Sequence, residues 1–331
     1  MIRSHIIIIT IFLVFTHSLL FAFGLSANLK VPLKVGAIVY SDEFLPGLEG
    51  LKAGLKELKY LNEKSVYFDI RVINGDLSRI ESLLEEFYSK GIKVLFVTTT
   101  PVAIKVMQLN KKYNFKVIFN EVADPVLSNL ANSLETPGKN MTGVSHAAFR
   151  MIPKRIQMAL EFFYDTKKVY YLKGDLSRKL KIVSDKVDET ERLLNIKIER
   201  INFGDSEYEN FLKKLSMQDN SNSIIILGPD AELVINFNKI RDMSYMYGIP
   251  LVAMDSSLVE RGATFAYASN FYDVGKQSSY ILDMIFKGAD ASLIPIQLPD
   301  DVGVYINKTA LKYIKNRYDL HFLHYARRCF E

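Results

Sequence analysis

Residues 92–107 read IKVLFVTTTPVAIKVM, and this stretch is the clearest guide to the fold. Its first half is apolar and rich in β-branched residues, three threonines follow, and Pro101 opens a second apolar segment. Residues of the first kind favour a buried strand, whereas proline is favoured at the first position of a helix. The stretch therefore predicts a strand that passes through a short polar turn into a helix, which is the repeating unit of a parallel sheet.

The same alternation of strand and helix continues on both sides of this stretch. Seven further runs predict strands: LKVGAIV at 33–39, VYFDIRVI at 66–73, FKVIFNE at 115–121, KKVYYL at 167–172, IKIERINF at 196–203, SIIILG at 223–228 and IPLVAM at 249–254. Between them lie helices with one apolar face, such as 46–60 with its leucines at helical spacing and 178–194. Stripes of this kind pack against a sheet, so they predict an α/β fold and say nothing about function.

The length of the chain favours two domains. Its 331 residues exceed the ~100 to 200 residues that one domain usually has. The segment ETPGKNMTGVSHAAF at 135–149 is rich in Pro, Gly, Asn and Thr, which predicts a crossing between lobes and a boundary near Val144. Beyond the last strand we expect a helix at 273–288, an extended piece at 303–309 and a C-terminal helix. Late return of the chain to the first half would give two lobes that bend about a hinge.

The N-terminus has the pattern of an export signal. Arg3 precedes the apolar run at 6–23, and small residues follow up to Ala27. We interpret residues 1–27 as a signal peptide or as an uncleaved signal anchor, and either one places the body outside the cytoplasm. The single cysteine, Cys329, excludes an internal disulfide. No lipobox cysteine follows the signal, so we expect a soluble periplasmic protein or one tethered by its own signal helix.

Charge and motifs exclude several classes of function. The 42 basic and 37 acidic residues are interspersed, which argues against a nucleic-acid partner or an anionic membrane surface. The sequence has no Gly-x-Gly-x-x-Gly, no P-loop, no Gly-x-Ser-x-Gly and no His-Glu-x-x-His or paired-cysteine spacing. We therefore expect no enzyme, no catalytic residue, no cofactor and no metal.

Polar residues at the strand ends are the candidates for a ligand site. In open α/β sheets, ligands bind beyond the carboxyl ends of the strands, where helix N-termini converge. The principal candidates for binding are Thr99, Thr100, Asp124, Ser145, Asp230 and Asp255, and weaker ones are Tyr40, Ser41, His146 and Asn270. Hydroxyls and helix amides suit a carboxylate, and aspartates suit an ammonium, so the set predicts a zwitterion such as an amino acid.

Each candidate also has a structural interpretation. Thr100 is placed to cap a helix that begins at Pro101. Asp124 precedes Pro125 in a typical turn sequence, and Asp230 and Asp255 each precede a helix that they could cap. His146 stands alone in a loop, without a nucleophile or metal partner. An apolar slot for a ligand side chain is expected from aromatic residues near the strand ends, namely Tyr40, Phe44, Phe119, Phe149, Phe271 and Tyr272.

Several stretches together resemble a known family. They are 47–76, VTTTPVAIKVM at 97–107, FNEVADPV at 119–126, LETPGKNMTGVS at 134–145, MDSSLVERGA at 254–263 and 272–288. Their order and spacing are similar to the ABC-transporter substrate-binding family that includes tryptophan- and tyrosine-binding lipoproteins. The resemblance runs from about Leu33 to about Leu311. His146, where members often have an acidic residue, and the turn 228–230 depart from the family pattern and leave the ligand open.

The resemblance implies a type I periplasmic-binding-protein fold, in which two doubly wound, Rossmann-like lobes close like a Venus flytrap. Three hinge segments are implied near Val144, Asn270 and Leu298. The first lobe is then 28–143 plus about 271–297, and the second is 144–270 plus about 298–331. The implied function is capture of a small molecule for an ABC permease in the inner membrane, by a monomer. The alternative is a receptor of the same fold that signals to a membrane partner.

Overall fold

The computed structural model describes residues 32–60 and 65–331. The predicted export signal at 1–27 therefore lies outside the described residues. Within the part that is described, no helix is long and apolar enough to cross a membrane.

The first lobe is built on a sheet of five parallel strands in the order β2-β1-β3-β4-β5. The strands are β1 (Leu33–Val39), β2 (Val66–Val72), β3 (Val94–Thr98), β4 (Lys116–Val122) and β5 (Met141–Ser145). Strands β1, β3, β4 and β5 are buried along nearly their whole length, as expected of a parallel sheet that helices cover on both faces. The carboxyl ends of all five strands therefore meet at one edge.

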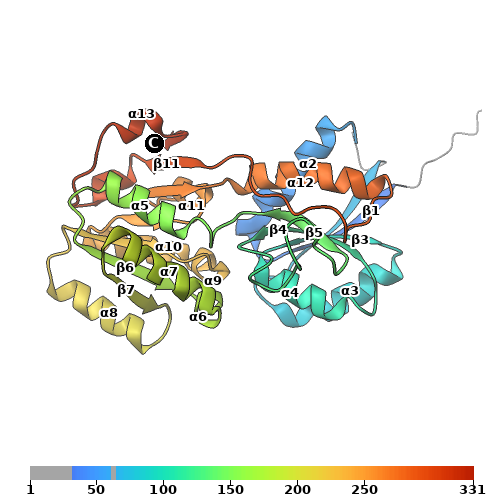
Figure 1. The fold of residues 1–331 in the computed structure, drawn as a ribbon, viewed down its shortest axis with the longest axis horizontal. Helices are drawn as coiled ribbons and strands as arrows, with labels where there is room; N and C mark the ends of the chain where they lie inside the picture. The colour runs from blue at the N-terminus through green and yellow to red at the C-terminus, as the bar shows by residue number, and fades with distance from the viewer. Residues whose placement is uncertain (1–31, 61–64) are drawn as a thin grey trace, which may run out of the picture. The chain divides into compact units, whose positions relative to one another are not determined.

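Two layers of helices cover this sheet, as Figure 1 shows. Helices α3 (Ile80–Ser89) and α4 (Thr100–Leu109) enclose one apolar core, which contains the buried residues Phe87, Leu95 and Val106. On the other face α2 (Leu45–Glu57) packs against α12 (Phe271–Phe286), which is more than 200 residues away in the sequence. Short 3-10 turns, η1 (Asp42–Phe44) and η2 (Leu77–Arg79), precede α2 and α3.

The second lobe has a sheet of seven strands in the order β12-β11-β10-β9-β8-β6-β7. They are β6 (Lys168–Lys173), β7 (Ile198–Asn202), β8 (Ser223–Leu227), β9 (Leu251–Ala253), β10 (Phe265–Ala268), β11 (Gly303–Asn307) and β12 (Arg328–Phe330). All neighbours are parallel except β10 and β11, which pair antiparallel. The second sheet thus repeats the doubly wound pattern and adds an edge made by late residues.

Helices cover both faces of the second sheet as well. The core on one face contains residues of α5 (Ile152–Phe162) and α7 (Lys181–Leu194), and the core on the other contains residues of α8 (Ser206–Met217), α10 (Phe237–Tyr247) and α11 (Ser256–Glu260). The shorter helices α6 (Asp175–Lys179) and α9 (Ala231–Ile235) follow β6 and β8 directly. Both begin at the edge of the sheet where the strands end.

The chain passes between the two sheets three times. It leaves the first sheet after β5, returns from β10 to α12, and goes back from α12 to β11. The first and third passages run side by side, because Val144 and Gln297 form a parallel bridge and Ser145 N donates to Gln297 O. The fold class predicted from the sequence, two doubly wound α/β lobes, agrees with this arrangement.

The segment around Val144, which the sequence predicts to cross between the lobes, also contributes a strand, because residues 141–145 form β5, the last strand of the first sheet. One local prediction needs correction. The predicted C-terminal helix is wrong: the 3-10 turn η3 (Ala310–Tyr313) and the one-turn α13 (Phe322–Tyr325) lead into β12. Arg328, Cys329 and Phe330 extend the second sheet by pairing with β11, so the final residues add a strand to the sheet edge.

Candidate functional site

A cavity lies between the carboxyl ends of the two sheets and takes side chains from both lobes. Its lining consists of Phe44, Thr99, Thr100, Pro101, Glu121, Ala123, His146, Leu176, Pro229, Asp230, Ala231, Met254 and Phe271. The cavity has a volume of about 20 Å³, enough for roughly one water. It adjoins a larger groove of about 290 Å³, which Tyr40 also lines, and the two spaces share Pro101, Leu176, Asp230 and Ala231 as lining residues.

The threonine loop after β3 brings the start of α4 to this cavity. Thr99 precedes the helix with φ 70°, a left-handed backbone that a β-branched residue adopts only under strain. Thr100 was expected to cap α4, and this expectation is wrong. Thr100 is the first residue of the helix, and its Oγ1 accepts a hydrogen bond from Ala123 N at 3.1 Å. Thr99 occupies the cap position, and its side chain makes no capping bond.

Three buried hydroxyls in the first lobe have no partner among the described residues. They are Thr99 Oγ1, Ser41 Oγ and Ser128 Oγ, and the three residues are at most 7% exposed. Thr99 lines the cavity together with the first turn of α4, whose amides carry the positive end of the helix dipole. Unpaired hydroxyl groups beside a helix N-terminus are suited to an anionic group such as a carboxylate.

Glu121 is the site residue that sequence reasoning missed. A register shift between Asn120 and Val122 interrupts the pairing of β4 with β5, and Glu121 lies there with φ 57°. A bulge of this kind re-aims a side chain, and here it turns a carboxylate into the cavity. A glutamate within the otherwise apolar run FKVIFNEV was the signal that could have identified it, since an ionisable side chain is rarely buried without a purpose.

The carboxylate of Glu121 is buried, and few polar groups offset the cost of removing its charge from water. Neither oxygen has a hydrogen-bond partner of acceptable geometry among the described residues. Burial, followed by the charge of Asp255, raises the pKa of Glu121 well above its ordinary value, and the nearby Asn120 amide and Gly47 backbone only partly oppose the rise. The charge of a carboxyl group in the second lobe therefore acts on a carboxyl group of the first lobe.

Asp255 caps α11 and has one free oxygen. Its Oδ1 accepts a hydrogen bond from Ser257 N at 2.6 Å, as the sequence suggested for a helix cap. Its Oδ2 is buried and has no partner among the described residues. Burial raises the pKa of Asp255 to about 6, against hydrogen bonds from the first turn of α11 that lower it. Asp255 therefore combines a structural bond with an unused acceptor.

His146 and Arg155 complete the buried polar set. His146 lines the cavity with its ring edge-on to Phe271, 5.6 Å between centroids, and its Nδ1 is unpartnered among the described residues. Burial and the charge of Arg155 lower the pKa of His146 to about 3, so its ring is neutral. Arg155 is fully buried, donates to Tyr267 O and Met254 O, and remains charged although burial lowers its pKa to about 10.

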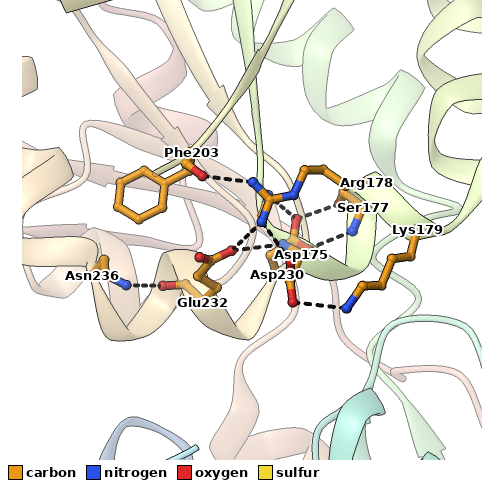
Figure 2. Close-up of polar contacts among 9 residues, drawn as sticks. Asp175, Ser177, Arg178, Lys179, Phe203, Asp230, Glu232 and Asn236 are labelled. Atoms are coloured by element: carbon orange, nitrogen blue, oxygen red, sulfur yellow. Dashed lines mark hydrogen bonds and ion pairs between the residues drawn. The ribbon is translucent and has the colours of Figure 1, made fainter. Parts of the chain in front are cut away.

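Asp230 lines the cavity, but its carboxylate is occupied by the second lobe. It accepts from Gly174 N at 3.0 Å, from Ser177 N at 2.8 Å and from Ser177 Oγ at 2.5 Å. Figure 2 shows these bonds beside the exposed group in which Asp175 pairs with Arg178 and Lys179. The candidate aspartate thus fixes the turn between β6 and α6 rather than offering free oxygens to a ligand.

Two other candidates lie outside the cavity lining. Asp124 Oδ1 accepts from Val126 N and Leu127 N, and its Oδ2 pairs with Arg150 Nε at 2.8 Å. Ser145 Oγ donates to Val122 O and accepts from Ala147 N. Their polar atoms hold the chain where it leaves the first lobe, in the manner of the Asp-Pro turn that the sequence also allowed.

The remaining candidates frame the cavity. Asn270 caps α12 by accepting from Asp273 N at 3.2 Å, and its Nδ2 donates to Ser256 Oγ in the second lobe. Tyr40 lines the adjoining groove and packs edge-on against Phe44, which stacks on Phe271 with 5.7 Å between centroids. Of the aromatic residues suggested for an apolar slot, Phe44 and Phe271 line the cavity, whereas Phe119 and Phe149 are buried in the cores and Tyr272 is exposed.

Comparison with known proteins decides the family. The sequence model of the family described as ABC transporter substrate binding protein matches residues 33–329. The chain belongs to this family. This substrate-binding protein is therefore a binding protein and not an enzyme, and the resemblance noted from its motifs is confirmed. Substrate-binding proteins of ABC transporters act outside the cytoplasm, which is the compartment that the family implies for this chain.

Individual relatives agree with the family and with the fold. A tyrosine-binding protein of Clostridioides difficile is 21% identical over 271 residues, which are 81% of this chain and 77% of the relative. A Streptococcus pneumoniae ABC domain in complex with L-Trp has a TM-score of 0.78 at 18% identity, over 90% of this chain and 100% of the other. The ligand-free, open structure of a Clostridium difficile substrate-binding protein with adhesive properties has a TM-score of 0.68 at 19% identity, over 87% and 96%. The last two share the fold, so the predicted fold class is confirmed.

Proposed function

We propose that this substrate-binding protein captures an amino acid, with an aromatic one as the first candidate, and delivers it to an ABC permease. The observation that carries the proposal is one cavity lined by the unpaired hydroxyl of Thr99 at a helix N-terminus, the unpaired buried carboxylate of Glu121 and an aromatic wall. These are the three chemistries that the carboxylate, the ammonium and the side chain of an amino acid require. Relatives named for tyrosine binding and for a complex with L-Trp support the same ligand class.

The first lobe supplies the proposed carboxylate position. Thr99 and the first two residues of α4, Thr100 and Pro101, line the cavity, and no acidic side chain of α4 competes there, because the first turn of that helix contains none. Hydrogen bonds to a charged carboxylate are roughly twice as strong as neutral ones. The positive φ of Thr99 is strained, and we attribute this strain to the orientation of the first turn of α4 toward the ligand.

The apolar wall supplies the proposed position of the ligand side chain. Phe44 and Phe271 come from the first lobe, and Leu176 and Met254 come from the second. Aromatic pairs prefer stacked or edge-to-face contacts, which two such rings offer to a third. Because the cavity holds about one water, a ligand of amino-acid size enters from the adjoining groove only when the lobes separate.

The finer localisation and the assembly state follow from the sequence and remain part of the proposal. We take residues 1–27 to export the chain to the periplasm and the mature protein to act as a monomer beside an inner-membrane permease. Mass spectrometry of the protein recovered from cells would identify the mature N-terminus, and light scattering would give the assembly state. Retention of residues 1–27 would instead favour the signal-anchored form.

A thermal-shift screen of the purified protein against the L-amino acids, nucleosides, purines and small sugars tests the ligand class. A ligand that binds only the folded state adds about 2.7 kcal/mol of stability at a hundredfold excess over Kd. We expect the largest shift with tryptophan, tyrosine or phenylalanine. A response to sugars or nucleosides alone would contradict the amino-acid proposal.

A hydroxyl deletion tests the carboxylate position. Thr99→Val removes only the unpaired hydroxyl, and we expect affinity for L-tryptophan to fall about tenfold, in line with loss of a hydrogen bond to a charged group. Affinity for tryptamine, which lacks the carboxylate, should stay unchanged. The matched control is Thr142→Val in β5, whose buried hydroxyl donates to Ile294 O away from the cavity. Equal losses for both ligands would place the carboxylate elsewhere.

A further inference from the structure

We propose that Glu121 and Asp255, one from each lobe, form a carboxylate pair that receives the ligand's ammonium group, and that binding expels a proton from the pair. The inference rests on the proposed amino-acid function. It identifies the residues through which recognition of the ligand's ammonium group would favour the closed arrangement of the two lobes. Neither residue is needed for the fold in the way that Asp230 or Asp124 is, because each keeps an oxygen free.

The first observation is the unpartnered carboxylate of Glu121. It is 3% exposed, lines the cavity and has no hydrogen-bond partner of acceptable geometry at either oxygen among the described residues. The chain holds it there by a bulge and a left-handed backbone angle, both of which cost free energy. Gly47 leaves room for this carboxylate, because a Cβ at position 47 would lie 2.3 Å from Glu121 Oε1.

The second observation comes independently from the other lobe. Asp255 is fully buried, and one of its oxygens caps α11 while the other has no partner among the described residues. Its charge contributes to the raised pKa of Glu121. Met254, the residue before it, lines the cavity. A cation placed between Glu121 and Asp255 would contact both lobes at once and would therefore stabilise the closed state alone.

The two carboxyl groups differ in the charges around them. Arg155 and Arg261 are the cations that act on Asp255, and Tyr305 also acts on it, whereas none of the groups that shift the pKa of Glu121 is a cation. Arg155 donates from Nε to Tyr267 O and from Nη2 to Met254 O, and its Nη1 has no partner among the described residues. His146 is neutral because burial and Arg155 hold its pKa near 3, so it supplies no positive charge. Asp230 is nearby but accepts three bonds from its own lobe.

Proton release follows from the electrostatics. Without ligand, burial favours the protonated form of both carboxyl groups, and the charge of Asp255 raises the pKa of Glu121 further, so Asp255 titrates at about pH 6 and Glu121 above its ordinary range. A ligand ammonium favours the ionised form, so each binding event transfers a carboxyl proton to solvent and breaks no other bond. Affinity should then increase with pH, by up to tenfold per unit below the pKa of the free pair.

Isothermal titration calorimetry with L-tryptophan and L-tyrosine at pH 6, in phosphate and in Bis-Tris, measures the proton count from the dependence of heat on buffer ionisation. We expect wild type to release protons on binding and to bind indole-3-propionate, which lacks the ammonium, at least thirtyfold more weakly than tryptophan. In Glu121→Gln and Asp255→Asn we expect weaker tryptophan binding and fewer released protons. A merely structural role would not change the proton count.

Asp69→Asn is the matched control, since Asp69 is also a buried carboxylate of the first sheet but pairs with Arg71 and Lys90 away from the cavity. Its proton count should equal that of wild type. Tryptophan binding without proton release, and within threefold of wild type in Glu121→Gln, would overturn the pair. Binding of tryptamine but of no amino acid would overturn the amino-acid function and support the pair. If neither amino acids nor tryptamine bind, both proposals fall.

Discussion

Single residues in the cavity show two ways of burying a carboxylate. Asp230 accepts three hydrogen bonds within its own lobe, whereas Glu121 accepts none of acceptable geometry from the described residues. A buried acceptor with donors stabilises the fold, and one without donors destabilises it until a donor arrives. The two residues should therefore respond in opposite ways to substitution.

Asp230→Ala should destabilise the second lobe more than it changes ligand preference. It leaves Gly174 N and Ser177 N without their acceptor, and a buried group left unpaired costs about 1–3 kcal/mol. We expect the free energy of unfolding in urea to fall by roughly 2–4 kcal/mol. Asp175→Ala, on the exposed side of the same turn, is the control and should cost far less. Equal effects would mean that the Asp230 bonds contribute little.

Asp255 gives stability a pH dependence of known sign. Its folded pKa, about 6, exceeds the ordinary value of 3.8, so the folded state binds its proton more tightly and wild type loses stability as pH rises from about 4 to about 6. The free energy of unfolding of Asp255→Asn should therefore rise relative to that of wild type over this pH window, by on the order of 3 kcal/mol. Urea unfolding at several pH values measures the difference. Asp76→Asn should show the opposite trend at lower pH, because hydrogen bonds from Ser78 lower the pKa of Asp76 below 3.8 and wild type then gains stability as pH rises toward about 4.

The sequence could identify only part of the site. Residues that follow a legible strand, such as Thr99, Asp230 and Asp255, do line or border the cavity. Whether their polar atoms are free depends on partners distant in sequence, such as Ser177 for Asp230, which no local pattern reveals. Glu121 was not predicted as a site residue, because strand periodicity assumes regular pairing and a bulge reverses the face of the sheet on which a side chain lies.

Among the elements, helices α2 and α12 cover one face of the first sheet by packing against each other. The two helices approach so closely that glycines are required at the contact: a Cβ on Gly275 would lie 1.8 Å from Gly47 O, and one on Gly50 would lie 1.9 Å from Tyr272 O. The apolar stripe of 46–60 was legible from the sequence, but its glycines were not understood as a contact surface, because their partner lies more than 200 residues away.

Gly275→Ala should separate these helices. Since the clash is with backbone, rotamer changes cannot relieve it, and we expect a loss of several kcal/mol or a lobe that fails to fold cooperatively. Lys56→Ala on the exposed side of α2 is the control and should change stability by less than about 0.5 kcal/mol. Calorimetry would separate a loss of stability from a loss of cooperativity. A Gly275→Ala protein as stable as the control would contradict the close packing.

Elements with strong periodicity were predictable, and elements that depend on distant pairing were not. All eight strand runs found in the sequence occur in the structure. Strand β5, at 141–145, lies in a segment rich in Gly and Thr, and β12 has three residues. Both obtain their hydrogen bonds by joining the edge of a sheet that other residues build.

At the scale of the whole molecule, contacts that exist only between closed lobes should set how long a ligand stays bound. Outside the cavity, Ile235 of the second lobe reaches toward Gly75 of the first, with its Cδ1 3.7 Å from the position that a Cβ on Gly75 would take. The carboxylates of Glu232 and Asp175 also act on Tyr40 across the groove. A ligand shifts the lobes toward closure only by its differential affinity, and such contacts add to that difference.

Ile235→Ser should therefore weaken ligand binding without touching the cavity. Loss of a partly buried branched side chain removes roughly 1 kcal/mol from the closed state, which corresponds to about a fivefold faster dissociation of L-tryptophan in stopped-flow experiments. The unfolding free energy of the ligand-free protein should stay within about 0.5 kcal/mol of wild type, because Ile235 is already 39% exposed. Leu193→Ser, an exposed apolar position on α7, is the control and should leave the rate unchanged. If both variants release tryptophan at the wild-type rate, the contact near Gly75 does not hold the lobes together, and ligand retention must come from the cavity residues alone.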